Sequence, residues 1–241
     1  KNFKNLTDLI SPSSSTKIEN FAFNGCSSLA TINFPNSLNS IGDGAFSFCS
    51  SLTTVEIKRD LQNIGDGAFA NCIGLEEINV NIYNENYTSI NGVLHSKDET
   101  IIICFPPAKN DSTFRIQDNI MIIENFAFSN CYNLTKIIWG NSIKKLGNYS
   151  FSNTSLTHIY IPESVTNISH YAFSYCSSLE TVIVSKNVEY IGSYAFGYTS
   201  INSFSFLGMK EPEKGYNIFE HCTFKEIYVL KDFLQSLCVY I

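Results

Sequence analysis

The sequence predicts an α/β repeat solenoid of about eight coils of 23 residues, with a parallel β-sheet along one face and an inserted β-hairpin. One observation is a repeated stretch: residues 41–57 read IGDGAFSFCSSLTTVEI, and residues 64–80 read IGDGAFANCIGLEEINV. The other is spacing, since a period in the twenties is typical of stacked coils. The phenylalanine that follows alanine in most copies recurs at intervals of 23, 23, 59, 23, 22, 23 and 23 residues, at Phe23, Phe46, Phe69, Phe128, Phe151, Phe173, Phe196 and Phe219.

The composition favours one elongated domain. Hydrophobic residues make up 44% of the 241 positions, and each coil of a solenoid needs a neighbour to bury its apolar side. The net charge is −6 and no run of lysine or arginine occurs, so there is no electrostatic reason to expect binding to nucleic acid or to an anionic membrane. No apolar run approaches the roughly 18 residues that span a bilayer, and no hydrophobic leader follows Lys1.

Both ends of the chain are predicted to cap the stack. Residues 1–17 form an N-terminal cap segment, in which Leu6 and Leu9 cover the open edge of the first coil. The solenoid spans 18–230. Residues 231–241 place apolar side chains on one helical face and are predicted to be a C-terminal cap.

Each coil is predicted to contain one strand with one buried face. The relevant segments alternate large apolar residues with others and are rich in β-branched types. One strand per coil, always in the same direction, builds a parallel sheet with about 4.8 Å between strands. Residues 43–46 are predicted to form a helical turn opened by a polar cap. The strand segments are 29–34, 52–57, 75–80, 134–139, 156–161, 179–184, 201–206 and 224–229.

One interval departs from the period. Between Phe69 and Phe128, the extra length falls in residues 81–116. This insertion contains a strand at 92–96, a polar turn, and a second strand at 100–105 before two prolines. Two strands joined by a short polar turn predict a β-hairpin within the stack.

The pattern Ile-Gly-x-x-Ala-Phe-x-x-Cys-x-x-Leu-x-x-Ile-x-Ile, copied over residues 18–229, resembles the BspA-like leucine-rich repeat family. The resemblance implies a leucine-rich-repeat right-handed superhelix. Members are often surface or secreted proteins of mucosal bacteria and parasitic protists, and some bind host or matrix glycoproteins. The family has no catalytic residues to carry over. Thr154 and Thr199 depart from the pattern by replacing its cysteine, and Phe224 replaces its leucine.

Six of the eight cysteines lie three residues after a repeat phenylalanine: Cys26, Cys49, Cys72, Cys131, Cys176 and Cys222. A zinc site needs ligands that converge, usually through close pairs, and no Cys-x-x-Cys occurs. Threonine at the same position in two copies favours a buried group that hydrogen-bonds the neighbouring loop. Disulfides and metal binding are the alternatives. Cys104 and Cys238 lie outside this column.

No motif points to catalysis or to a cofactor. The Gly-Asp-Gly stretches at 42–44 and 65–67 recur at turn positions and do not continue into a phosphate-binding loop, so turn geometry explains them. The four histidines are scattered, and no nucleophile elbow occurs. We therefore expect no enzyme, no cofactor and no metal.

The candidate binding site lies on the outer face of the predicted sheet. Side chains alternate between the two faces of a strand, so one column points away from the core. Contiguous exposed apolar groups with a polar rim mark recognition surfaces, although strand propensity alone also favours such residues. The column reads Asn33, Glu56, Asn79, Ile138, Tyr160, Ile183, Ser205 and Tyr228. The candidate partner-binding residues are Ile138, Tyr160, Ile183 and Tyr228 in this column, and Lys136 and His158 in the next.

These features predict a non-catalytic protein-binding module, for which two hypotheses stay open. The first is a surface adhesin or ectodomain that binds a host or matrix protein or glycoprotein through the sheet face, at the cell surface or secreted. The second is an intracellular scaffold or sensor that binds a cytosolic protein. Unpaired cysteines suit a reducing compartment and keep the second hypothesis open.

Overall fold

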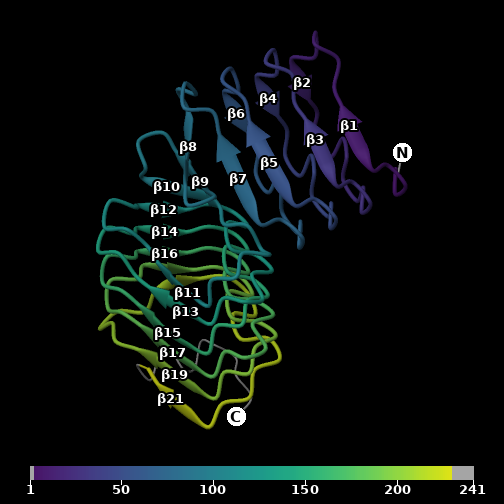
Figure 1. The fold of residues 1–241 in the computed structure, drawn as a ribbon. Coiled ribbons are helices and arrows are strands. Elements are labelled where there is room, and N and C mark those ends of the chain that lie inside the picture. The colour runs from purple at the N-terminus through teal and green to yellow at the C-terminus, as the bar shows by residue number, and fades with distance from the viewer. Residues whose placement is uncertain (1–2, 230–241) are drawn as a thin grey trace. The chain divides into compact units, whose positions relative to one another are not determined.

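The computed structural model describes residues 3–229, which form two units of stacked coils (Figure 1). Of the described residues, 3–110 and 124–131 form the N-terminal unit, and 111–123 and 132–229 form the C-terminal unit. Within residues 3–229 there are strands and turns but no helix. The α/β class is therefore not confirmed, and each unit is a parallel β-solenoid in the part that the structure describes.

The N-terminal unit has two rows of parallel strands. Pairing joins β1 to β3 and β5 to β7 in the broad row, and β2, β4 and β6 in the short row. Paired residues such as Val55 and Ile78 are one repeat apart, so identical repeat positions lie side by side. The broad row is β1 (Asp8–Ile10), β3 (Thr31–Asn33), β5 (Thr54–Ile57) and β7 (Glu77–Val80), and the short row is β2 (Lys17–Ile18), β4 (Ser40–Ile41) and β6 (Asn63–Ile64).

The C-terminal unit repeats this plan. Its broad row pairs β11 with β13, and joins β15, β17, β19 and β21 into one parallel sheet. Its short row is parallel throughout. The broad row is β11 (Thr113–Arg115), β13 (Lys136–Ile138), β15 (His158–Ile161), β17 (Thr181–Val184), β19 (Ser203–Phe206) and β21 (Glu226–Tyr228), and the short row is β12 (Ile122–Ile123), β14 (Lys145–Leu146), β16 (Asn167–Ile168), β18 (Tyr190–Ile191) and β20 (Glu213–Lys214).

The described residues contain ten broad-row strands rather than the eight predicted. The two additional strands are β1, which lies in the predicted N-terminal cap segment, and β11, which lies in the predicted insertion. Neither follows an Ala-Phe turn, which is why the periodic search missed them. Each nevertheless pairs in parallel with the strand of the next coil, so β1 and β11 belong to the broad rows. The predicted C-terminal cap, 231–241, lies outside the described residues.

A column of phenylalanine rings fills the core of both units. The rings of Phe46, Phe128, Phe151, Phe173 and Phe196 are fully buried, as predicted. Rings of adjacent coils stack with centroids 5.2 to 5.8 Å apart, from Phe23 through Phe46 to Phe69, and from Phe151 through Phe173 and Phe196 to Phe219. Offset stacking adds to the large apolar area that each ring removes from water. The column therefore joins successive coils through the core.

Phe105 is a ninth member of this column that sequence reasoning missed. It stacks on Phe128 at 5.1 Å, and its N–H donates to the Ala127 carbonyl at 2.7 Å. Phe46 makes the equivalent bond to Ala68 at 2.8 Å. Pro106 and Pro107 follow Phe105, and Ala108 stands where other coils have cysteine or threonine, so the repeat pattern did not reveal it.

The turn around each of the eight predicted phenylalanines has left-handed backbone on both sides. For Phe46, the flanking positions are Gly44, with φ of 55°, and Phe48, with φ of 62°. A right-handed helix cannot continue through such residues, so the helical turn predicted at 43–46 does not form. Gly42 in the same turn is needed for lack of space, because a Cβ there would lie 2.3 Å from the Asn20 side chain of the preceding coil.

The predicted hairpin forms, and it has a third strand. The antiparallel strands are β8 (Tyr87–Ile90), β9 (Val93–Ser96) and β10 (Ile101–Cys104). Asn91 and Gly92 join β8 to β9 with φ of 52° and 79°, which suits the tight primed turn that Asn-Gly favours. Phe105 follows β10 directly, so the hairpin returns the chain to the core.

The cysteine column links successive coils by hydrogen bonds. The thiols of Cys72 and Cys176 donate to the phenylalanine carbonyl of the preceding coil, each at 3.1 Å. Thr154 instead donates to Phe151 in its own coil at 3.1 Å, and its hydroxyl lies 3.3 Å from the Cys176 sulfur. Cys49 and Cys222 donate to the phenylalanine carbonyl of the preceding coil at 3.3 and 3.1 Å, so the predicted hydrogen bond to the neighbouring loop is confirmed for these four thiols. The seven cysteines among the described residues are free. Cys238 lies outside those residues.

Replacing Phe46 by alanine should lower the free energy of unfolding by about 3–5 kcal/mol, because a buried ring is lost from the column. Denaturant unfolding measures this loss. Phe48→Asn is the matched control, since Phe48 is 54% exposed and Asn71 occupies the equivalent position with φ of 60°. The control should change the stability by no more than about 0.5 kcal/mol. A loss below about 1 kcal/mol for Phe46→Ala would contradict the buried column.

Buried thiols of the column should resist alkylation while the chain is folded. Burial raises the pKa values of the Cys131 and Cys176 thiols, and only the thiolate reacts with iodoacetamide. Labelling near pH 8, quantified by mass spectrometry, should therefore be slow before unfolding in guanidinium and fast afterwards. Labelling of the folded chain should also accelerate as the pH rises towards the raised pKa values, because more of each thiol is then thiolate. Rapid labelling of Cys131 in the folded chain would show that its thiol is not enclosed.

Candidate functional site

The sheet of β15, β17, β19 and β21 aligns part of the predicted binding column. Tyr160 pairs with Ile183, Ile183 with Ser205, and Ser205 with Tyr228. Tyr160 is 48% exposed and Tyr228 is 60% exposed, whereas Ile183 and Ser205 are half-buried. We call this row the tyrosine-bearing sheet face. It presents two large aromatic side chains on a hydrogen-bonded support.

The remaining predicted site residues lie in two places. His158 is exposed at the start of β15, in register with Thr181 on β17. Lys136 and Ile138 lie on β13, which pairs in parallel with β11. In this pairing Ile138 lies opposite Arg115. The structure therefore groups Tyr160, Ile183, Tyr228 and His158 on one four-stranded sheet, and it places Lys136 and Ile138 on the β11–β13 ladder.

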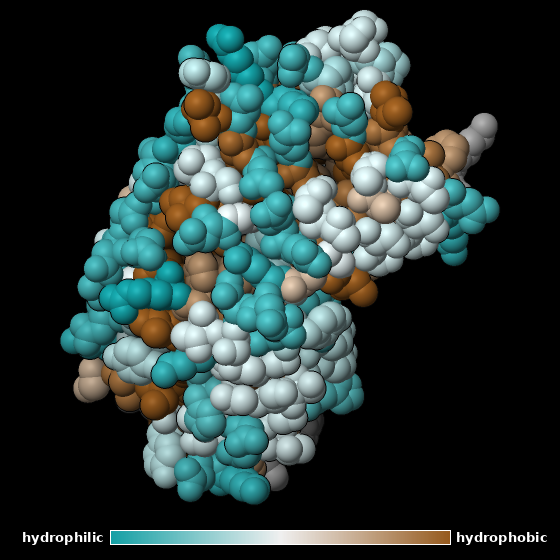
Figure 2. Space-filling model, in the orientation of Figure 1, coloured by the Kyte–Doolittle hydropathy of each residue, from teal (hydrophilic) through white to brown (hydrophobic). Residues whose placement is uncertain are grey.

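The outward column of the N-terminal unit is polar, as the sequence indicates. Asn33, Glu56 and Asn79 are exposed there. Asn79 donates to Glu77 at 2.9 Å. On the face shown in Figure 2, apolar side chains appear in small groups between polar ones. In the C-terminal unit, Trp139 is half-buried and packs edge-on against Phe151 with ring centroids 5.5 Å apart.

Two tyrosine ladders in the C-terminal unit were not found by sequence reasoning. They occupy the left-handed positions two residues before and two residues after the repeat phenylalanine. Ring stacking is close, with centroids 4.6 to 4.9 Å apart and interplanar angles of 3° to 9°. Reading those two positions down the repeat would have revealed the ladders, which are Tyr149, Tyr171 and Tyr194, and Tyr175 and Tyr198.

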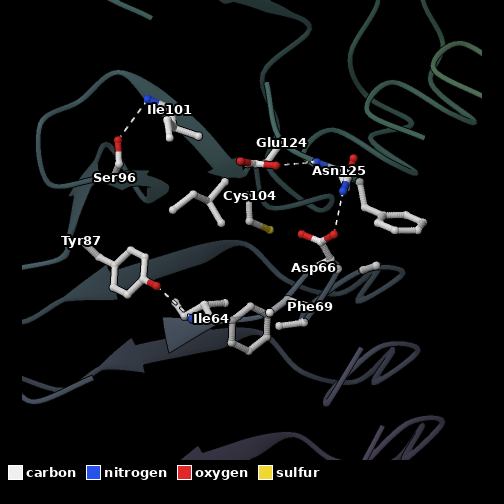
Figure 3. Close-up of a pocket in the computed structure, with 15 residues that line it drawn as sticks. Ile64, Asp66, Phe69, Tyr87, Ser96, Ile101, Cys104, Glu124 and Asn125 are labelled. Atoms are coloured by element: carbon white, nitrogen blue, oxygen red, sulfur yellow. Dashed lines mark hydrogen bonds between the residues drawn. The ribbon is translucent and has the colours of Figure 1, made fainter. Parts of the chain in front are cut away.

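A cavity of about 240 Å³ lies within the N-terminal unit (Figure 3). Two turns, residues 64–70 and 124–126, form two of its sides, and the hairpin contributes side chains from Tyr87, Ser96 and β10. The cavity has an apolar part and an acidic part. Its apolar walls come mainly from Ile64, Ile101, Ile103, Cys104 and Phe126, and its carboxylates come from Asp66 and Glu124.

Hydrogen bonds fix the polar groups of this cavity. Asn125 donates from its side chain to Asp66 at 2.7 Å and from its backbone to Glu124 at 3.3 Å. The Tyr87 hydroxyl accepts the Ile64 N–H at 2.9 Å and donates to the Gln62 carbonyl at 3.2 Å. The tyrosine thus satisfies a backbone group beside the cavity and is not a free reactive group.

Burial favours the neutral forms of two titratable residues near the hairpin, Cys104 and His95. Burial raises the pKa of the Cys104 thiol to about 12, so this thiol stays protonated and weakly nucleophilic at neutral pH. Burial lowers the pKa of His95, whose Nδ1 lies 2.9 Å from the Val93 carbonyl. Among residues 3–229, no group of three or more histidine, cysteine or acidic side chains is placed to hold a metal ion.

Stacked coils of one repeat each, with leucine, isoleucine and phenylalanine in the core, define a leucine-rich-repeat protein. The model of the BspA type leucine-rich repeat region matches six copies in this chain, over residues 1–99 and 103–226. The chain therefore belongs to the BspA-type leucine-rich-repeat family, as the sequence resemblance indicated.

Several solved structures share this fold. The pneumococcal vaccine antigen PcpA is 24% identical, with a TM-score of 0.79 over 91% of this chain and 56% of its own. A leucine rich cell surface protein from Faecalibacterium prausnitzii is 27% identical, with a TM-score of 0.69 over 85% of this chain and 61% of its own. A leucine-rich repeat protein from Eubacterium ventriosum is 20% identical, with a TM-score of 0.61 over 91% of this chain and 84% of its own.

The chain spans less than two thirds of the first two of these proteins. No curated protein matches it. Across residues 3–229, no helix is long and apolar enough to cross a bilayer.

Proposed function

We propose that the chain is a non-catalytic protein-binding module that uses the tyrosine-bearing sheet face. The observation that carries this proposal is the in-register row from Tyr160 to Tyr228 across four strands. Tyrosine supplies a large contact area with few rotatable bonds, and it is enriched among the residues that dominate binding energy at interfaces. A continuous sheet holds these side chains in place before a partner arrives, which lowers the entropy cost of association.

Polar groups border this row and suit a protein or glycoprotein partner. His158 and Thr181 lie in the neighbouring column, which continues through Ser203 to Glu226 on β21. Lys136 and Ile138 on β13 extend the proposed surface. A mixture of hydroxyl, imidazole and charged groups around aromatic side chains is the usual composition of an interface rim.

We propose a location at the cell surface or outside the cell, with an adhesin-like role towards host or matrix proteins. Two observations support it: membership of the BspA-type family, and likeness to a solved protein described as a leucine rich cell surface protein. The second candidate is an intracellular scaffold, which the seven free cysteines favour because free thiols persist in reducing compartments. Labelling of intact cells with a membrane-impermeant reagent separates the two, since only a surface protein is modified.

Tyr160→Ala and Tyr228→Ala should each weaken binding to a matrix glycoprotein at least about tenfold, because each removes an exposed aromatic contact. Surface plasmon resonance on single immobilised matrix glycoproteins measures the affinity. Ile138→Asp tests whether the surface extends to β13. Asn33→Ala is the control, since Asn33 is exposed on the broad row of the N-terminal unit.

The proposal fails if a glycoprotein that binds the wild-type chain binds both tyrosine variants with unchanged affinity. It also fails if Asn33→Ala weakens binding as much as they do. Denaturant unfolding of each variant distinguishes loss of contact from loss of fold, because Tyr160 and Tyr228 are exposed and their removal should leave stability nearly unchanged.

A further inference from the structure

The cavity of the N-terminal unit exists because one coil is short. Ile102 accepts a backbone hydrogen bond from Glu124 at 3.0 Å, as Ile41 does from Gly65 at 2.8 Å. Ile102 is thus the counterpart of Ile41. Since Phe105 is the counterpart of Phe46, the usual four residues between isoleucine and phenylalanine are here reduced to two, 103–104. The turn that normally projects between neighbouring coils is missing at this point.

Glu124 occupies a column position where other coils have almost no side chain. In coils that have a complete turn and also follow a complete turn, the residue after the short-row strand is glycine or serine, because atoms of the preceding coil leave little room for a larger side chain. A Cβ at Gly65 would lie 2.4 Å from the Asp43 nitrogen, and one at Gly192 would lie 2.4 Å from the His170 nitrogen. The column reads Glu19, Gly42, Gly65, Ile103, Glu124, Gly147, Ser169, Gly192 and Gly215.

Glutamate therefore occurs at this position only in the two coils whose preceding coil has no complete turn. Glu19 lies in the first coil to have this turn, and Glu124 follows the shortened coil. Figure 3 shows the Glu124 carboxylate close to Cys104 and Asn125, on the same side of the cavity as Asp66. The space left by the missing turn thus contains an acidic side chain and not a repacked apolar one.

The two carboxylates of the cavity lack a cationic partner. Neither Asp66 nor Glu124 pairs with a lysine or arginine among residues 3–229. Each receives a hydrogen bond from Asn125 on one oxygen, Oδ2 of Asp66 and Oε2 of Glu124. The second oxygen of each remains available to a further donor.

The apolar side chains that line the cavity are only partly covered by the rest of the chain. Ile64 is half-buried, whereas its counterparts Ile41, Ile123, Ile168 and Ile191 are at most 1% exposed. Ile101 and Ile103 on β10 are also half-buried and line the same space. The cavity therefore offers an apolar wall beside an acidic end.

We propose that this cavity binds a primary ammonium group carried on a short apolar chain, as in a lysine side chain or a free alkylamine. The ammonium donates charge-assisted hydrogen bonds to the open oxygens of Asp66 and Glu124. The methylene groups lie along Ile64, Ile101 and Ile103, in the way that lysine stems cover apolar surface. A volume of about 240 Å³ is below the roughly 300–1,000 Å³ of pockets for drug-sized ligands, so it suits a group of side-chain size.

Pentylammonium and pentanol test this assignment, since they share an alkyl chain and differ in charge. In titrations followed by amide NMR shifts, pentylammonium should bind at least about tenfold more tightly than pentanol and should shift the signals of residues 64–67 and 124–126. Glu124→Gln should weaken pentylammonium binding at least about tenfold. Glu19→Gln, which removes the same charge from the same column outside the cavity, should leave the affinity unchanged.

N-acetyl-lysine methylamide distinguishes the two sources of the ammonium group. If it binds as tightly as pentylammonium, the site accepts lysine from a polypeptide, and if only pentylammonium binds, the site accepts free amines. Both results support the proposal. Equal binding of pentanol and pentylammonium would overturn it, as would unchanged binding by Glu124→Gln. Asp66→Asn provides a second variant should Glu124→Gln alter the unfolding curve. The proposal does not depend on the tyrosine-bearing sheet face.

Discussion

Close approach between the turns of successive coils is the constraint on which the rest of the structure depends. A Cβ added at Gly42, Gly65 or Gly192 would lie 2.3 or 2.4 Å from atoms of the preceding coil. This proximity lets the backbone around each phenylalanine hydrogen-bond to the next coil, as Phe46 does to Ala68. It also sets the ring spacing in the core. The short distance between successive coils therefore accounts both for glycine in the turns and for stacked phenylalanine rings in the core.

At the surface, side chains of the turns also form hydrogen bonds to the equivalent turn of the next coil. The Asp43 carboxylate accepts the N–H of Asp66 at 2.9 Å, and His170 Nδ1 accepts the N–H of Ser193 at 2.9 Å. Asparagine, aspartate, histidine and serine thus serve one purpose, which is to accept a hydrogen bond from the next coil. Where the turn is shortened, before Glu124, the register relaxes and a cavity appears. The same constraint thus explains both the uniformity of the coils and its local exception.

The sequence was sufficient to predict strands and buried positions wherever a residue type recurs with the repeat. Phe46 and its counterparts, the strand segments and the thiol column were all found because burial requires the same residue type in each coil. β1 and Phe105 were missed because the repeat turn is absent before β1 and shortened before Phe105. The cavity was missed for a further reason. It arises from a difference of two residues in turn length, which becomes visible only when hydrogen bonds establish which positions are equivalent.

Aromatic residues in left-handed turns show how neighbouring coils influence each other's sequence. A left-handed conformation costs about 1–2 kcal/mol for an ordinary residue, and one aromatic contact returns about 0.5–1.5 kcal/mol. Tyr171, with φ of 57°, stacks on rings in both adjacent coils, so the two contacts can offset the strain. Phe21 has a glycine as its neighbour in the next coil, and a Cβ at Gly44 would lie 2.5 Å from the Phe21 ring. An aromatic ring in this column therefore lies beside a second ring or a glycine in at least one adjacent coil, as the stacked run of Tyr149, Tyr171 and Tyr194 illustrates.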